Sequence, residues 1–197
     1  MSWQQPPPPE QAARQAAEAG DPAAQRHLGM LLWQQGKLAE AEHWLRRAAS
    51  AGVRIADGSF GLLLAAQGKA EAEAWLQHAA EGGDDVSGYN LGVLLQRQGR
   101  LAEAEQWFRR AAAAGDRDAW GSVGLILAEQ GNLAEAERWL APPAEAGDRN
   151  AAYNLAALLQ RQGRLAEAEH WLRRAAEAGH PYAESALAML RSWREAR

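Results

Sequence analysis

Apolar residues recur along the chain with helical spacing, in pairs of short segments. In residues 24–32, Ala24, Leu28, Leu31 and Leu32 fall at i, i+4, i+7 and i+8, which places them on one face of a helix. The following segment carries a second apolar stripe, with charged residues such as Glu42 and Arg46 between its members, which are Leu38, Ala41, Trp44, Leu45 and Ala48. Because one hairpin of two helices cannot bury both stripes, the pattern predicts stacked helix pairs.

Two series of glycines divide the chain at a nearly constant interval. Each glycine follows a run of strong helix formers, where a left-handed C-terminal cap favours glycine, so each one is predicted to end a helix. The first series closes the phrase before Leu-Ala-Glu-Ala-Glu, at intervals of 32, 31, 32 and 32 residues, and comprises Gly36, Gly68, Gly99, Gly131 and Gly163. The second series closes the phrases Ala-Ala-x-x-Gly and comprises Gly20, Gly52, Gly83, Gly115, Gly147 and Gly179.

Helix starts follow the second series. Asp21, Asp84, Asp116 and Asp148 come directly after a glycine, where an aspartate caps a helix, and Pro22 suits the first helical position. The sequence therefore predicts an all-α chain of antiparallel helix pairs: five full repeats of 31–32 residues with N- and C-terminal half-repeats. The repeats are 21–52, 53–83, 84–115, 116–147 and 148–179, and the half-repeats are 10–19 and 181–195.

Two repeats depart from the pattern. The second has Val53 where an aspartate cap is expected and lacks the leucine after Lys69, so its helix boundaries should be the least regular. In the fourth, Pro142 and Pro143 replace an Arg-Ala pair, and an interior proline costs about 3 kcal/mol or more. That helix is predicted to kink or break near Leu140.

The first nine residues differ in composition from the rest. They contain four consecutive prolines, which favour an extended polyproline geometry. We expect residues 1–9 to be a disordered Pro-rich leader, and residues 10–197 to form a single repeat domain. The closing segment is polar at Arg191, Arg194 and Glu195, as a helix that seals the end of a stack should be.

Charge and composition exclude several classes of protein. The formal net charge is only -4 and the signs alternate, which predicts no nucleic-acid partner. No apolar run is long enough to cross a membrane, and residues 1–10 lack the basic and apolar regions of a signal peptide, so a cytoplasmic location is expected. Without cysteine there are no disulfides and no thiolate chemistry.

Candidate catalytic groups are scattered. The five histidines fall in different repeats and no two have the i, i+4 spacing of a helical metal site, while the Ala-Glu-Ala-Glu carboxylates lie at helix N-termini, where the helix dipole explains them. We expect no enzyme, no metal and no cofactor. The tryptophans at one position of each repeat, Trp120, and the glutamine before each inter-helix glycine are interpreted as structural.

The pattern resembles the tetratricopeptide repeat, on Leu28-Gly29, Leu32, Ala41, Leu45 and Ala48 at their spacing. Tyr-Asn-Leu-Gly at 89–92 is even more similar to the related Sel-one-like repeat, although the longer inter-helix loop of that family and the proline that closes a tetratricopeptide unit are missing, and the period is shorter than the usual ~34 residues. The resemblance implies a right-handed α-solenoid with a concave groove that binds protein.

Carried over by position, the groove lies on the side of each first helix opposite the apolar stripe. Asn90 and Asn154 would bond the backbone of an extended peptide, Arg97 and Arg161 would meet a carboxylate, and aromatic residues would anchor it. Alternatively, the Tyr and Asn side chains only support packing between first helices. The candidate groove residues, with Ile55 and Met189 on the same face, are Arg26, His27, Met30, Trp33, Ser59, Tyr89, Asn90, Val93, Arg97, Asp118, Ser122, Leu125, Glu129, Asn150, Tyr153, Asn154, Arg161, Tyr182 and Trp193.

The leading hypothesis is therefore an interaction scaffold or adaptor that holds a peptide segment or a partner protein, as a monomer or with weak self-association. A second hypothesis is a self-assembling structural protein, because the third and fifth repeats are nearly duplicates and could stack end to end. An enzyme or small-molecule sensor is less favoured, since no cluster of titratable residues converges.

Overall fold

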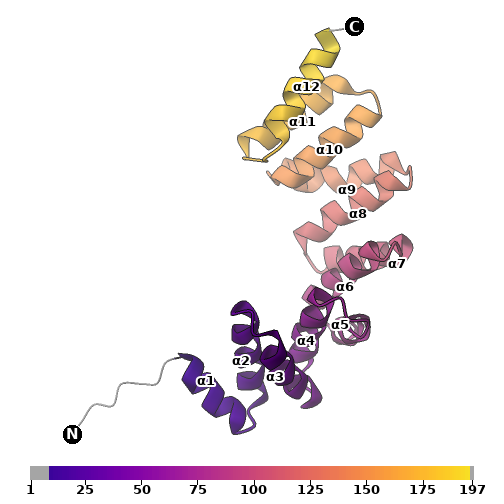
Figure 1. The fold of residues 1–197 in the computed structure, drawn as a ribbon. Helices are drawn as coiled ribbons and strands as arrows, with labels where there is room; N and C mark the ends of the chain where they lie inside the picture. The colour runs from indigo at the N-terminus through magenta and orange to yellow at the C-terminus, as the bar shows by residue number, and fades with distance from the viewer. Residues whose placement is uncertain (1–8, 196–197) are drawn as a thin grey trace, which may run out of the picture. The chain divides into compact units, whose positions relative to one another are not determined.

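The computed structural model describes residues 9–195, and this part of the chain forms helices and no strands (Figure 1). The predicted leader therefore lies outside the described residues, except that Pro9 already begins the first helix, where a proline is tolerated. The described chain consists of two compact units. The first ends at Arg100 and the second begins at Leu101.

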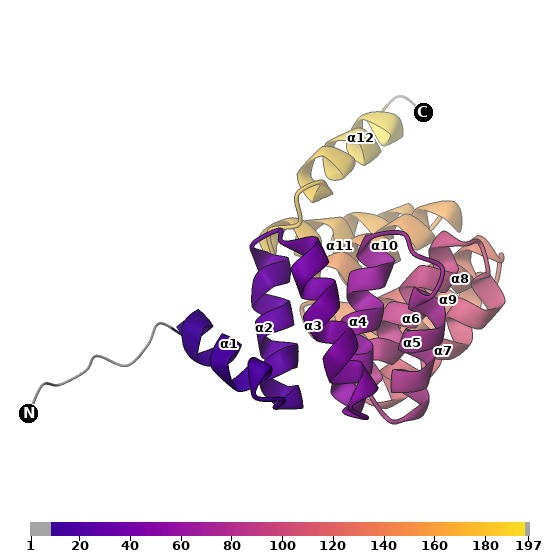
Figure 2. The same ribbon diagram turned by 60° about the horizontal axis from the view of Figure 1, so that its bottom comes forward.

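In the first unit each helix packs on the next one in sequence, and alternate helices also touch: α2 lies against α4, and α4 lies against α6 (Figure 2). The first helices of successive repeats are thus neighbours, as stacked helix pairs require. The helices are α1 (Pro9–Glu18), α2 (Pro22–Gln34), α3 (Leu38–Ser50), α4 (Arg54–Ala66), α5 (Ala72–Glu81) and α6 (Asp85–Arg97).

The second unit repeats this arrangement. Successive helices pack on one another, and α8 also lies against α10. Its helices are α7 (Leu101–Ala113), α8 (Arg117–Glu129), α9 (Leu133–Glu145), α10 (Arg149–Arg161), α11 (Leu165–Glu177) and α12 (Ala183–Glu195). Within each unit the predicted helix pairs are confirmed, and α1 and α12 are the helices of the two half-repeats.

The helix boundaries follow the predicted punctuation. All eleven glycines of the two series have positive φ, between 69° and 99°, which is the conformation of a left-handed cap. Asp21, Asp116 and Asp148 each accept hydrogen bonds from two backbone amides of the first turn. Asp84 also occupies a cap position, but its carboxylate accepts from the Ser87 hydroxyl and caps no backbone amide.

The second repeat is the irregular one, as predicted. Val53 makes no side-chain cap, and α5 starts only at Ala72, so it has 10 residues where the other second helices have 13. Without the leucine the first turn of α5 is lost, and residues 67–71 connect the two helices, whereas residues 35–37 make the same connection in the first repeat.

The apolar stripes form the core. Leu28, Leu32, Ala41 and Leu45 are fully buried, and Phe60 packs edge-on against Trp75 at 5.2 Å between ring centroids. Trp44 is buried, whereas the equivalent tryptophans and Trp120 are half-buried. Leu38 was predicted to belong to the stripe but is 44% exposed, because it is the first residue of α3 and lies at the end of the helix.

The predicted break in α9 does not occur. The helix runs through Pro142 and Pro143 to Glu145, with the same 13-residue length as its equivalents. Both prolines lie in the last four residues of the helix, and their fixed φ is compatible with it. The end of α9 closes with hydrogen bonds of 3.0 Å from the Ala146 and Asp148 amides to the carbonyls of Pro142 and Pro143.

A polar ladder joins successive repeats. The glutamine before the inter-helix glycine donates to a glutamate of the preceding second helix: Gln35 to Glu10 at 2.9 Å, Gln98 to Glu73 at 3.5 Å, Gln130 to Glu105 at 3.1 Å and Gln162 to Glu137 at 3.5 Å.

A cation two residues after the glutamine also contacts the glutamate at most of these connections: Lys69 contacts Glu42, Arg100 contacts Glu73 and Arg164 contacts Glu137. The hydrogen bond from Lys69, followed by the one from Arg46, lowers the pKa of Glu42 against the opposing effect of its burial. The predicted glutamine ladder is confirmed at the four glutamines that donate to a glutamate, whereas Gln67 makes no such hydrogen bond within the described residues and Lys69 makes the connection to Glu42.

The last glutamate of the ladder, Glu169, meets the closing helix. Arg194 occupies the glutamine position and contacts Glu169 Oε2 at 2.6 Å, while Arg191 stands where the other first helices have a core leucine and contacts Oε1 at 3.1 Å. Arg173 of α11 completes the cluster at 2.6 Å. Hydrogen bonds from Arg191 and then Arg173 lower the pKa of the Glu169 carboxyl. The polar end cap predicted from Arg191 and Arg194 is thus an arginine clamp on one carboxylate.

Candidate functional site

The candidate site is the side of each first helix that lies opposite its buried stripe. In α2 this side comprises positions 23, 27, 30 and 34, spaced i, i+4, i+7 and i+11. We call these positions and their equivalents the first-helix face. The equivalents are 55, 59, 62 and 66 in α4, 86, 90, 93 and 97 in α6, 118, 122, 125 and 129 in α8, 150, 154, 157 and 161 in α10, and 182, 186, 189 and 193 at α12.

Most of the predicted groove residues lie on this face. Four do not: Arg26, Trp33, Tyr89 and Tyr153 stand at neighbouring positions and are half-buried. Trp33 packs against the core, and Tyr153 stacks on His180 with 4.1 Å between ring centroids. These side chains are therefore partly engaged in the fold, which is what the packing alternative expects of the two tyrosines.

In the first unit, α2, α4 and α6 bring their predicted residues together. Arg26 Nη1 reaches Ser59 Oγ at 3.5 Å and so links α2 to α4, while the buried Ser59 hydroxyl donates to the Ile55 carbonyl at 3.0 Å. Asn90 donates its amide to the Val86 carbonyl of its own helix at 2.7 Å. His27 and Arg97 are exposed, and Met30 and Val93 are half-buried beside them.

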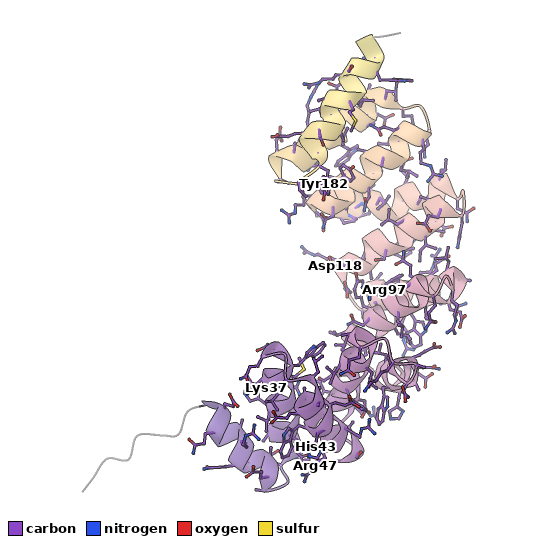
Figure 3. The ribbon with its side chains drawn as sticks, in the orientation of Figure 1. Lys37, His43, Arg47, Arg97, Asp118 and Tyr182 are labelled. Carbon is purple, nitrogen blue, oxygen red and sulfur yellow. The ribbon has the colours of Figure 1, made fainter. Side chains whose placement is uncertain are left out.

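In the second unit, α8 and α10 carry the exposed residues Asp118, Leu125, Glu129, Asn150 and Arg161 (Figure 3 labels Asp118). The half-buried Ser122 bonds back to the Asp118 carbonyl at 3.1 Å. Asn154 is half-buried and makes no hydrogen bond with any residue from 9 to 195. Tyr182, which Figure 3 places just before α12, is 65% exposed, and Trp193 is 44% exposed.

In both units most of the large exposed apolar side chains stand at positions of the first-helix face. Among the described residues, the large apolar side chains that are exposed are Leu38, Ile55, Val86, Leu125, Tyr182, Met189 and Trp193. All except Leu38 stand at positions of the first-helix face. Val86, at 62% exposure, is the one that sequence reasoning missed. It occupies the same repeat position as Ile55 and Tyr182, and this equivalence was the signal that could have found it.

The first-helix face carries few charged side chains, and its two arginines can bind a partner. Arg97 and Arg161 occupy one repeat position, both are exposed, and neither makes an ion pair or hydrogen bond with another described residue. Glu129 holds the same position in α8 with the opposite sign. Within residues 9–195 no three metal-ligating side chains lie close enough to hold an ion, and no helix is long and apolar enough to span a membrane.

Comparison with known families decides the class of the protein. One tetratricopeptide repeat model matches residues 23–55, 87–114 and 150–178, and a second model of the same repeat matches residues 124–142, so that together they cover more than half of the chain. The chain belongs to the tetratricopeptide repeat family. The sequence matches no curated protein.

Solved structures show the same architecture for this tetratricopeptide repeat protein, an all-α repeat solenoid. YrrB, a TPR protein with an unusual peptide-binding site, is 22% identical over 90% of this chain and 98% of its own, with a TM-score of 0.70. The protective antigen c5321 of uropathogenic Escherichia coli, which displays an SLR fold, is 26% identical over 92% of this chain but only 43% of its own, with a TM-score of 0.74. A Sel1 repeat protein from Oxalobacter formigenes is 23% identical over 88% of this chain and 86% of its own, with a TM-score of 0.63.

Proposed function

We propose that this tetratricopeptide repeat protein is an interaction scaffold whose first-helix face binds a segment of a partner protein. The observation that carries the proposal is the placement of the large exposed apolar side chains: of the seven in the described part of the chain, six fall on this face. A set of exposed apolar residues rimmed by polar ones is typical of an interaction surface. Binding a partner removes this apolar surface from water, which is favourable. The fold favours the same function, because tetratricopeptide repeats generally serve as protein-interaction scaffolds.

The polar residues of the face suit an extended, partly acidic segment. Arg97 and Arg161 have no partner among the described residues and could each form a bidentate pair with a carboxylate. Asn154 has an amide with no hydrogen bond to the described chain, which suits a peptide backbone. Asn90 is a weaker candidate, because its amide group already donates to the Val86 carbonyl.

Photo-crosslinking in the native host tests the proposal. A photoreactive phenylalanine at position 86 or 125 should give an adduct with a partner, whereas the same residue at position 38, which is 44% exposed but lies on a second helix, should not. The double variant Arg97→Glu and Arg161→Glu should weaken the adducts at both face positions. Adducts that form equally at position 38 would refute the assignment of the face.

The mass of the adduct separates the scaffold from self-assembly. An adduct that contains one copy of this chain and another protein supports the scaffold. An adduct of two copies of this chain, together with a molar mass that rises with concentration in light scattering, would support the self-assembling alternative.

A further inference from the structure

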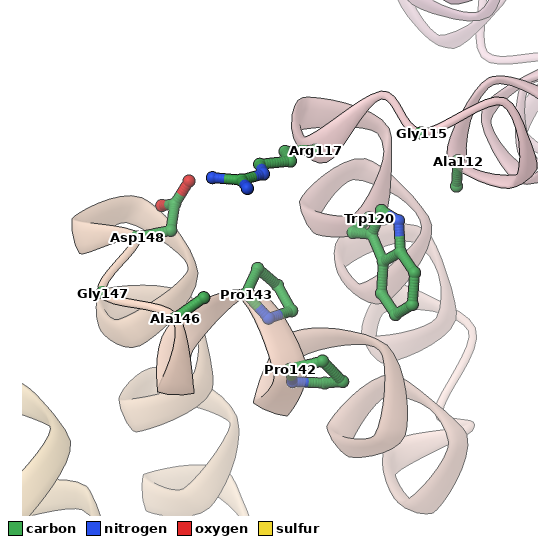
Figure 4. A pocket seen from close by; sticks show the side chains of 9 residues that line it. All are labelled: Ala112, Gly115, Arg117, Trp120, Pro142, Pro143, Ala146, Gly147 and Asp148. Carbon is green, nitrogen blue, oxygen red and sulfur yellow. The ribbon is translucent and has the colours of Figure 1, made fainter.

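A cavity of about 480 Å³ in the second unit is built from residues outside the first-helix face. It lies among the end of α7, the start of α8 and the end of α9, with the indole of Trp120 on one side and the rings of Pro142 and Pro143 on another (Figure 4). Arg117 and Asp148 stand beside it. No residue of the predicted groove lines it.

Comparison between repeats shows what is unusual about this cavity. Trp120 and Pro142 occupy two repeat positions that are polar or small, paired with a cation or histidine, in every other repeat: Gln25 with Arg47, Asp57 with His78, Gly88 with Arg110, and Ala152 with Arg174. The first repeat has a cavity at the equivalent place, and Gln25 and Arg47 line it. In the second, Asp57 Oδ2 lies 3.6 Å from His78 Nε2. The fourth repeat alone replaces both positions with apolar rings.

Arg117 also departs from its equivalents. Arg54 and Arg149 hold the same repeat position, and each donates to a backbone carbonyl at the end of the following second helix: Gly82 at 2.9 Å and Gly179 at 3.0 Å. Arg117 makes no hydrogen bond or ion pair within the described residues. Figure 4 shows its guanidinium extended toward Asp148, but no hydrogen bond or ion pair joins the two side chains, and Asp148 Oδ1 accepts from the Asn150 and Ala151 amides at 2.8 and 2.9 Å. An unpaired cation therefore stands at the edge of an apolar cavity.

We infer that this cavity binds an aromatic side chain of a partner polypeptide next to a carboxylate of the same segment. The faces of Trp120 and the proline rings accept a ring, because aromatic pairs pack in offset or edge-on arrangements and bury much apolar area. The unpaired Arg117 guanidinium accepts the carboxylate in a charge-assisted pair. The inference does not depend on the proposed role of the first-helix face.

A polypeptide fits the openness of the cavity better than a free small molecule does. Gly115, Arg117 and Pro142 are exposed, so the cavity is open to solvent along these residues. Small-molecule sites bury about 70–90% of their ligand. A residue held in a peptide segment obtains its remaining contacts and its alignment from the residues that flank it.

Four short peptides test the chemistry, with the full-length ¹⁵N-labelled protein observed by NMR. The probe acetyl-Glu-Phe-Glu-amide should shift the amide signals of residues 115–120 and 142–148. Acetyl-Gln-Phe-Gln-amide and acetyl-Glu-Ala-Glu-amide should each bind at least fivefold more weakly, because each lacks one of the two features. Acetyl-Lys-Phe-Lys-amide should bind more weakly still, since its charges repel Arg117.

Two variants and a matched control place the peptide in the cavity. Arg117→Gln should weaken the acidic peptide at least fivefold and bring its affinity close to that of the glutamine peptide. Trp120→Ala, which installs the alanine that the fifth repeat has at Ala152, should weaken the binding of all three phenylalanine peptides. Arg149→Gln changes the equivalent arginine, which is already bonded to a carbonyl, and should leave the affinity unchanged.

Several results would overturn the inference. Equal binding of the acidic and basic peptides would remove the role of Arg117, and unchanged binding by both variants would remove the cavity. If free 3-phenylpropionate bound as tightly as the acidic peptide, the site would serve a small molecule. If removing residues 1–8 strengthened peptide binding at least fivefold, the chain's own proline-rich start would be the occupant.

Discussion

Glycine has two structural roles in this chain, and only the first, ending a helix, could be predicted from the regular spacing of glycines in the sequence. The glycines that end helices have positive φ, and their place after runs of helix formers predicted them. Gly61 and Gly124 lie inside helices, where a methyl group would meet the leucine of the paired helix, Leu76 or Leu140. The sequence could not rank these two glycines, because the distance between paired helices depends on packing that no local signal records.

For two glycines within helices we predict opposite effects of substitution by alanine on the free energy of unfolding. In Gly61→Ala the new Cβ would lie 2.9 Å from Leu76 Cγ and 3.0 Å from the Leu76 backbone nitrogen, so the helices must separate. We expect a loss of about 1–3 kcal/mol in the free energy of unfolding. Gly121→Ala meets nothing within 4 Å and should gain up to about 1 kcal/mol. Urea titrations followed by circular dichroism measure both, and a stabilising Gly61→Ala would contradict the close approach.

A second prediction concerns His180, which stands where Asp21, Asp116 and Asp148 cap their helices. Its Nδ1 accepts from the Tyr182 amide at 3.3 Å, and its ring stacks on Tyr153. Burial, and then the nearby Arg149, lower the pKa of His180, so the unfolded chain binds a proton more readily than the native one. The stabilising contribution is present above a pH of about 6.5 and is lost as the pH falls from there through the lowered pKa.

Urea midpoints at pH 7.5 and pH 5.5 check this, with His180→Asp as the comparison. The wild-type protein should lose more stability than the variant over this interval, because an aspartate cap stays ionised throughout it. An equal loss in both proteins would show that other groups carry the pH dependence.

Among the elements, helix ends were predictable and helix continuity was not. Caps are local, so one aspartate or glycine decides a boundary, and the shortened α5 followed from a single missing leucine. The prediction that α9 breaks at Pro142 was wrong because it considered only the two backbone amide donors that the prolines lack. The position of those prolines in the last turn and the hydrogen bonds that close it keep α9 intact.

The arginine clamp at the end of the second unit gives a prediction for α12. Glu169→Gln keeps the shape of the side chain but removes the charge that Arg173, Arg191 and Arg194 share. Three arginines then repel one another beside α11, and we expect amide hydrogen exchange in α12 to accelerate several-fold. Glu177→Gln, at an exposed glutamate of α11 with no recorded partner in the described chain, is the control and should have no effect. Unchanged exchange in α12 after Glu169→Gln would mean that apolar packing alone holds the helix.

For the whole molecule, repetition made the architecture predictable, since five concordant copies of one pattern outweigh any ambiguous segment. The candidate face followed from helical periodicity, because the side opposite a buried stripe must be the outer one. The depth of each side chain did not follow: Tyr89 and Tyr153 lie one position off the face and are half-buried, while Val86 is exposed.

The repeat architecture also predicts how far the effect of a destabilising substitution extends along the chain. Each repeat derives its stability from itself and its immediate neighbours, so local destabilisation should fade along the array. In Gly61→Ala we expect faster amide exchange in α4 and α5, a smaller change in α2 and α6, and none in α10 and α11. Hydrogen exchange with mass spectrometry resolves these segments, and a uniform acceleration from α2 to α11 would show that the chain unfolds as a single cooperative block.

Because of the polar ladder, whole repeats can be added to this protein. Every repeat offers a glutamine at one side and a glutamate at the other, as with Gln162 and Glu169, so a copied repeat carries both halves of the connector that its neighbours need. A second copy of residues 148–179 inserted after Gly179 would present Glu169 with a new glutamine and arginine, and its own copied glutamate to Arg194. Gene duplication, or an engineer, can therefore extend the array in whole repeats without redesigning a junction, as long as the arginine-bearing helix remains last.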